Sequence, residues 1–154
     1  MNRSIPATYD DAELVLRLYE LRREEKLRAA REWFGTRFFP QSMDDVKAVA
    51  LGTGLENTYY RMVTSYWDMA ASFVAHGILN PALFLESGGE MLFVWAKLGE
   101  FVPEIRQELV TPRFLGNVEK VVGMVAWAPE RVQSIRARLP QYRERVMRQA
   151  KPSA

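Results

Sequence analysis

The sequence contains no cysteine and a single histidine, His76. Without cysteine the chain cannot form disulfides, thiolate metal sites, iron–sulfur clusters or a cysteine nucleophile. With one histidine it cannot build a multi-histidine metal site, and the Glu-x-x-His pairs of a di-iron bundle are missing. Because Gly77 follows it, we expect His76 at a helix end, where its charge favours the helix dipole. The sequence therefore predicts no metal and no other cofactor.

Long hydrophobic runs are also missing. No stretch approaches the roughly 18 uncharged apolar residues of a membrane-spanning helix. The first residues, Met-Asn-Arg-Ser-Ile-Pro, lack the continuous apolar core of a secretory signal. The absence of cysteine fits a reducing compartment. We therefore expect a cytoplasmic protein with no integral membrane segment.

No stretch alternates apolar and polar residues with a period of two, so the sequence predicts no sheet. Apolar residues recur instead at three- and four-residue steps, as on one face of a helix. A chain of 154 residues has the usual size of one domain. We predict an all-α, single-domain helical bundle over 1–154, with about five to seven helices, the first and last of them long. The ends, 1–6 and 150–154, are expected to be flexible.

The first helix is expected to begin after Thr8 and to run unbroken to Phe34. Thr8 and Asp11 have the spacing of a helix cap, and Gly35 supplies a stop signal. A single stripe of apolar residues along this helix is expected to face the core: Leu16, Tyr19, Leu27, Ala30 and Phe34.

A buried central helix is expected near 56–76, where apolar residues hold helical spacing and Gly77 supplies a C-terminal cap. Asn80 and Pro81 are typical of the cap and first position of a following helix. After two glycines, the stretch 90–101 is apolar nearly all round. Such a helix is either buried or turns half of its surface to a partner.

Short helical stretches are also expected from Ser42 to near Gly52 and between Pro103 and Pro112, and two further helices complete the fold. One covers 114–127 and is closed by Pro129, and the last follows it with a kink at Pro140. From Pro129 onward the chain carries a net charge of +5, against −3 for the rest. This last helix resembles a basic amphipathic helix that could contact an anionic surface, but a solvated helix face is the favoured reading. No nucleic-acid motif accompanies it, so no specific nucleic-acid partner is predicted.

Two carboxylates on the expected helices, Asp68 and Glu90, are candidates for ligand binding or catalysis. Asp68 lies between Trp67 and Met69 on an apolar helix, so we expect it to pair with Arg23 or Arg61. Alternatively, it forms the polar floor of a ligand cleft. An enzyme that uses Asp68 with Glu90 is the less favoured reading, since no nucleophile or acid–base motif accompanies them.

Three segments of the sequence resemble a family of uncharacterised bacterial all-α proteins, catalogued as a domain of unknown function. The likeness spans most of the chain, and it implies a helical bundle with no established activity or functional residues. The segments are Tyr19-Glu-Leu-Arg-Arg-Glu24, Ser65-Tyr-Trp-Asp-Met-Ala70, and Gly89-Glu-Met91 after the Gly77-Ile-Leu corner.

Abundant Trp, Tyr, Met and Arg residues favour a non-enzymatic protein-interaction module that can associate with itself as a homodimer. Phe93 and Trp95 are the expected interface residues. The alternative is a small-molecule binder with an aromatic and Met-lined cleft. An enclosed pocket with a polar anchor would favour the ligand, and a contiguous exposed apolar patch would favour the interface. The expected ligand-binding residues are Tyr60, Trp67, Asp68, Met91, Trp95 and Arg106.

Overall fold

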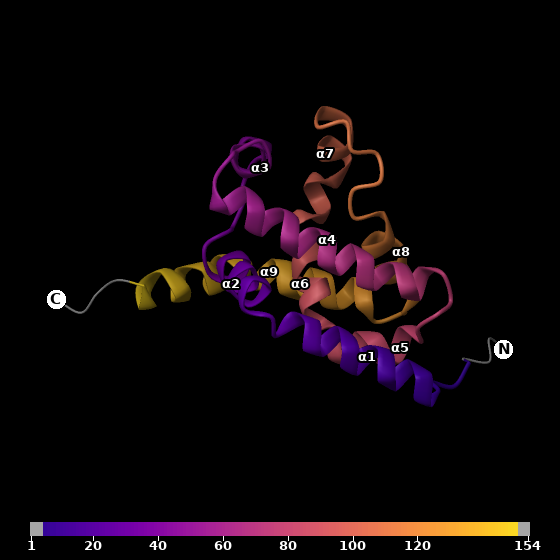
Figure 1. The fold of residues 1–154 in the computed structure, drawn as a ribbon. Helices are drawn as coiled ribbons and strands as arrows, with labels where there is room; N and C mark the ends of the chain where they lie inside the picture. Colours follow the sequence, from indigo (N-terminus) through magenta and orange to yellow (C-terminus); the bar gives the residue numbers. More distant parts are fainter. Residues whose placement is uncertain (1–4, 151–154) are drawn as a thin grey trace.

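The computed structural model describes residues 5–150, and this part of the chain forms nine α-helices and one 3-10 turn, with no strand (Figure 1). The all-α prediction is confirmed, but the expected number of helices was too low. Most of the expected flexible ends lies outside the described residues. The helices are α1 (Tyr9–Arg22), α2 (Glu25–Thr36), α3 (Met43–Ala50), α4 (Leu55–Ala75), α5 (Pro81–Ser87), α6 (Gly89–Leu98), η1 (Gly99–Phe101), α7 (Val102–Glu108), α8 (Gly116–Met124) and α9 (Ala128–Gln149).

The expected continuous first helix is instead two helices, α1 and α2, which meet at Arg23 and Glu24. Glu24 leaves the helical backbone conformation, and its carboxylate accepts a 2.9 Å hydrogen bond from the N–H of Leu27. Arg31 in turn donates to the carbonyl oxygen of Arg22, which the end of α1 leaves free (3.0 Å). Glutamate is not among the preferred capping residues, so the sequence gives no clear signal for this break.

The apolar stripe expected along this segment is also broken. Leu16 and Tyr19 of α1 are exposed, at 59% and 51%, whereas Leu18 is buried. The stripe fails because α2 starts in a new direction and its buried face does not continue the face of α1. Leu27, Ala30 and Phe34 of α2 are buried as predicted.

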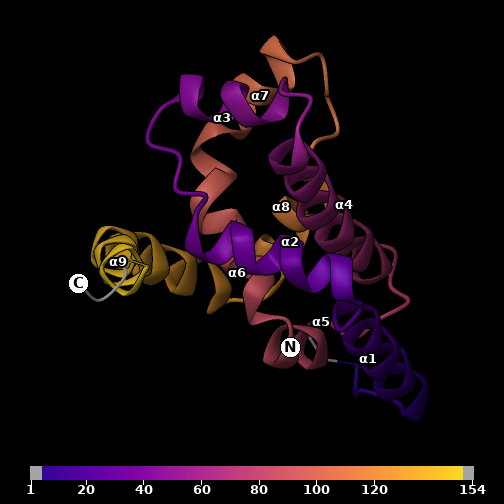
Figure 2. The ribbon, with the colours of Figure 1, turned by 60° about the vertical axis from the view of Figure 1, so that its left-hand side comes forward.

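The prediction of a buried central helix is confirmed by α4, which packs against α2, α3 and α8 (Figures 1 and 2). The helix α6 packs against α8 and α9 and is the second central element. Of the two readings of its apolar surface, burial applies to most of the helix. Its buried residues are Met91, Leu92, Val94, Ala96, Lys97 and Leu98.

The turn between α4 and α5 forms as predicted. His76 ends α4, with its Nδ1 atom 2.8 Å from the carbonyl oxygen of Ser72. Gly77 takes the left-handed conformation, with φ of 73°. The side chain of Asn80 accepts a 3.0 Å hydrogen bond from the N–H of Leu83 at the start of α5. These caps form as predicted because each depends only on residues close together in the chain.

The last part of the chain differs from expectation in two places. The helix predicted over 114–127 is shorter, because α8 starts only at Gly116 and ends at Met124. Pro129 does not close that helix but lies in the first turn of α9, where its missing N–H has no cost. The chain stays α-helical through Pro140 to Gln149. Between residues 5 and 150, no helix is both long and apolar enough to cross a bilayer.

Candidate functional site

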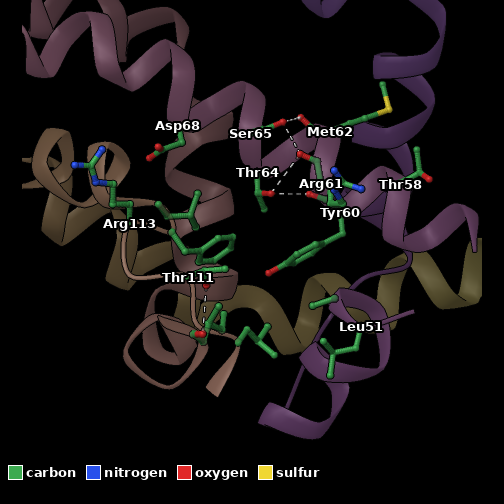
Figure 3. Close-up of a pocket in the computed structure, with 15 residues that line it drawn as sticks. Leu51, Thr58, Tyr60, Arg61, Met62, Thr64, Ser65, Asp68, Thr111 and Arg113 are labelled. Carbon is green, nitrogen blue, oxygen red and sulfur yellow. Dashed lines mark hydrogen bonds between the residues drawn. The ribbon is translucent and has the colours of Figure 1, made fainter. Parts of the chain in front are cut away.

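A groove of about 730 Å³ opens along α4, opposite α7 and the segment 109–115 that joins α7 to α8 (Figure 3). Pockets that bind small molecules usually have volumes of about 300–1,000 Å³. The groove is walled mainly by apolar side chains, with hydroxyls and charged groups at its rim. Its apolar wall is formed by Ile105, Leu109, Phe114 and Leu115.

Tyr60 projects from α4 into this wall and is only 5% exposed. Its ring stacks on that of Phe114, with centroids 6.0 Å apart, and meets the ring of Phe38 edge-on. Figure 3 shows its phenol group extending toward the segment that carries Thr111. The hydroxyl is buried and has no hydrogen-bond partner within residues 5–150. Burial raises the pKa of Tyr60 well above its usual range, so the hydroxyl stays protonated and can donate.

Asp68 lies at the other end of the groove and holds the start of α8. Its carboxylate accepts hydrogen bonds from the backbone N–H groups of Asn117 (3.0 Å) and Val118 (3.2 Å) and from the side-chain amide of Asn117 (3.0 Å). The predicted ion pair with Arg23 or Arg61 is wrong. The α8 N-terminus satisfies the carboxylate instead, because its first N–H groups have no partner within the helix.

Two arginines line the groove, and a third, Arg106, lies behind its wall. Arg61 and Arg113 line it, both are exposed, and neither forms an ion pair within the described residues. Arg106, an expected ligand anchor, does not line it. Its guanidinium donates to the carbonyl oxygen of Phe114 (3.0 Å) and pairs with Glu119 (2.7 Å). Arg106 therefore fixes the wall segment to α7 and does not face the groove.

The wall segment is framed by two strained residues. Val110 and Leu115 have φ of 54° and 51°, in the left-handed region that side chains other than glycine and asparagine rarely adopt. Val110 is β-branched and 82% exposed, and it directly follows the C-cap of α7, where the N–H of Thr111 donates to the carbonyl oxygen of Arg106 (3.2 Å). Strained backbone of this kind costs of order 1–3 kcal/mol per residue and tends to occur at binding sites. These two residues mark the ends of the segment 110–115, which forms one wall of the groove.

Of the six expected ligand-binding residues, the structure brings only Tyr60 and Asp68 to the groove. Trp67 and Met91 are buried in the core, and Trp95 is half-buried beside Gly99. The spacing of residues along α4 shows which of them share a face. It does not show which face meets α2 and which meets the groove. The sequence therefore could not separate the groove residues Tyr60 and Asp68 from the core residue Trp67.

Glu90, the other candidate carboxylate, lies outside the groove and forms an ion pair with Arg31. The guanidinium donates to both oxygens of Glu90, at 2.8 Å from Nε and 2.7 Å from Nη2. The indole N–H of Trp67 donates to the same carboxylate at 3.2 Å. This network joins α2, α4 and α6. Asp68 and Glu90 therefore do not share a site, which leaves the enzyme reading without its paired carboxylates.

The expected interface residues, Phe93 and Trp95, lie half-buried beside α9. The Phe93 ring meets the Tyr142 ring edge-on, with centroids 5.8 Å apart. Arg136 of α9 donates to the carbonyl oxygen of Ala96 (3.1 Å). Much of the surface expected to meet a partner is thus covered by the chain's own last helix.

Lys97 is a residue that the sequence analysis missed. It is 4% exposed, and its Nζ donates to the carbonyl oxygens of Phe34 (2.5 Å) and Phe38 (2.6 Å). The ring of Phe39 covers it, with the centroid 3.7 Å from Nζ. Burial lowers the pKa of Lys97 to about 7. Its position within the most apolar helix is the sequence feature that could have indicated a buried charge.

The described part of the chain holds no cluster of three His, Asp or Glu side chains that could bind a metal. The structure so far defines an all-helical protein with an open, mostly apolar groove along its central helix. Residues 7–127 match the family described as a domain of unknown function (DUF4760), and the chain belongs to this family. The matched region covers α1 to α8 and ends one residue before α9. No curated protein and no solved structure matches the chain.

Proposed function

We propose that this protein binds a small amphipathic organic anion in the groove along α4. The observation that carries the proposal is the groove itself, of about 730 Å³, with an apolar wall and two arginines that form no ion pair within residues 5–150. Ligand sites usually combine an apolar lining with a few polar groups that orient the ligand. The proposed function is binding without catalysis, in a cytoplasmic location.

The lining side chains favour a particular ligand chemistry. The apolar body of the ligand would lie against Ile105, Leu109 and Phe114. Its anionic group would meet the guanidinium of Arg61 or Arg113, which suits carboxylate, sulfonate or phosphate oxygens. The charge of Asp68 is offset by three N–H donors and the α8 N-terminus, so it opposes the anion only weakly.

The Tyr60 hydroxyl supplies a further donor beside the groove. A buried hydroxyl without a partner costs about 1–3 kcal/mol, which a ligand acceptor would recover. The hydroxyl is shielded from solvent, so the ligand must displace a neighbouring side chain to reach it. The strained segment 110–115 is the wall that we expect to move.

The experiment uses anilinonaphthalene sulfonate, a fluorescent probe with an aromatic body and one anionic group, and dodecanoate as competitor. Ser65 lines the groove from α4, so Ser65→Trp should fill it and abolish saturable probe binding. Ser72 lies two turns further along α4, outside the groove lining, and its hydroxyl also bonds to a carbonyl oxygen of its own helix. Ser72→Trp is therefore the matched control and should bind like the wild type. Equal binding by both variants would refute the proposed site.

A further inference from the structure

The outer edge of α9 carries a regular pattern of arginine and apolar residues. Arg131, Arg138 and Arg145 recur at seven-residue steps, with Ile135 and Tyr142 between them. Steps of four and three residues place all five on one face of the helix. This face lines a second groove, of about 450 Å³, between α9 and Phe93 of α6.

The three arginines of this stripe are exposed, and none forms an ion pair within residues 5–150. The guanidinium of Arg145 lies over the Tyr142 ring, 5.2 Å from its centroid. The apolar side chains between the arginines, Ile135 and Tyr142, are only half-buried. The stripe therefore combines positive charge that has no ion-pair partner within residues 5–150 with partly exposed apolar side chains.

The outer face of α1 carries the complementary pattern. Tyr9 and Leu16 are seven residues apart and are 79% and 59% exposed. Glu13 and Glu20, also seven apart, alternate with them, so all four lie on one face. Both glutamates are exposed and neither forms an ion pair within the described residues.

The two patterns have the same spacing. Seven residues rise about 10.5 Å along an α-helix, so charges and apolar groups on the two faces repeat at equal intervals. When two such helices lie side by side, apolar residues meet at the seam and opposite charges pair at its edges, as in coiled coils. Figure 2 shows α1 and α9 well apart in the fold, so such a contact would join separate molecules.

We propose that this protein associates with itself by docking the outer face of α1 from one copy into the groove along α9 of another. Glu13 and Glu20 pair with two of the three arginines, and Tyr9 and Leu16 pack against Ile135 and Tyr142. The surplus positive charge of the region after Pro129 and the negative charge of the rest of the chain favour the same contact. The region matched to the family ends before α9, so the arginine stripe of α9 lies outside it, whereas α1 lies inside it.

The test is a charge-exchange experiment read by sedimentation velocity. The wild type is measured over about 1 μM to 1 mM, a range that covers weak protein association. Two charge-reversed variants, R131E/R138E/R145E and E13R/E20R, are measured alone and mixed in equal amounts. All five residues are exposed, so both variants should fold, which circular dichroism checks.

The wild type should associate more strongly as its concentration rises, and added salt should weaken the association. Each variant alone should be monomeric, because its two docking faces now carry like charges. The mixture should associate again, since each reversed face finds an opposite partner on the other variant. A wild type that stays monomeric throughout, association that survives either reversal, or a mixture that stays monomeric would overturn the proposal. Probe binding in the α4 groove should be unchanged in both variants, which separates this test from that of the proposed function.

Discussion

The Nζ atom of Lys97 lies 2.6 Å from the carbonyl oxygen of Phe38, in the interior of the protein. Lys97 belongs to α6, whereas Phe38 follows the end of α2. The side chain therefore ties the connection between α2 and α3 to the central helix α6. It also brings a titratable group into the core, which makes the stability of the fold depend on pH.

The free energy of unfolding should rise between pH 7 and pH 9. In the unfolded chain Lys97 has its ordinary pKa of 10.5, whereas burial lowers the pKa to about 7 in the folded protein. In this window the unfolded state therefore binds more protons, so a rise in pH favours folding. A shift of this size corresponds to a gain of about 2 kcal/mol over the two pH units. Urea denaturation at each pH measures it.

The matched variant for this prediction is Lys97→Met, which keeps the length of the side chain and removes the titration. Its stability should change less between pH 7 and pH 9 than that of the wild type. The window stops short of pH 10 because burial raises the pKa of Tyr66 to about 12, which reverses the trend. Equal pH dependence in the wild type and the variant would contradict the assignment to Lys97.

Replacing Asp68 should destabilise α8. The carboxylate accepts three hydrogen bonds from Asn117 and Val118. A hydrogen bond to a charged group typically contributes about 1.5–3 kcal/mol to stability. We expect Asp68→Ala to lower the free energy of unfolding by about 2–3 kcal/mol. Asp68→Asn should lower it less, because its amide oxygen can still accept from the backbone. Thermal or urea denaturation compares the two, and equal losses would argue against the capping role.

Replacing Val110 should stabilise the protein. Its φ of 54° is unfavourable for a β-branched residue, whereas asparagine tolerates this conformation. We expect Val110→Asn to raise the free energy of unfolding by about 1 kcal/mol. Ile78 is also exposed and β-branched but has no positive φ, so Ile78→Asn serves as the control and should bring no gain. A loss of stability in Val110→Asn would show that the strain is not relieved there.

Tyr60→Phe should separate stability from binding. The hydroxyl has no partner within the described residues, so its removal should leave stability unchanged or raise it by up to about 1 kcal/mol. If the ligand accepts a hydrogen bond from Tyr60, the variant should bind it several-fold more weakly. Fluorescence titration with the anionic probe measures binding, and denaturation measures stability. A variant that loses stability would contradict the absence of a partner for the hydroxyl, and a variant that keeps full binding would contradict a hydrogen bond from Tyr60 to the ligand.

The sequence predicted those parts of the fold that depend on local chemistry. The extent of α4, the cap formed by Asn80 and the left-handed Gly77 follow from residues close together in the chain. It did not predict the break at Glu24, because that break depends on Arg31 and on a capping residue that is rarely used.

The candidate site was predicted only in part for the same reason. Tyr60 and Asp68, two of the residues expected in a ligand cleft, both line the groove, and both stand on one helix. The wall opposite them, with Phe114 and Arg113, comes from a connection about 50 residues further along the chain. Its position is set by the hydrogen bond from Arg106 to Phe114, which no spacing in the sequence reveals.

The most direct test of the proposed binding function is a titration of the labelled protein with dodecanoate, followed by ¹H–¹⁵N nuclear magnetic resonance. If the groove along α4 binds an amphipathic anion, the amide signals of residues 58–68 and 109–115 should shift together and saturate. Signals of α9 and of Phe93 should stay in place. Shifts confined to α6 and α9, or none at all, would contradict the account.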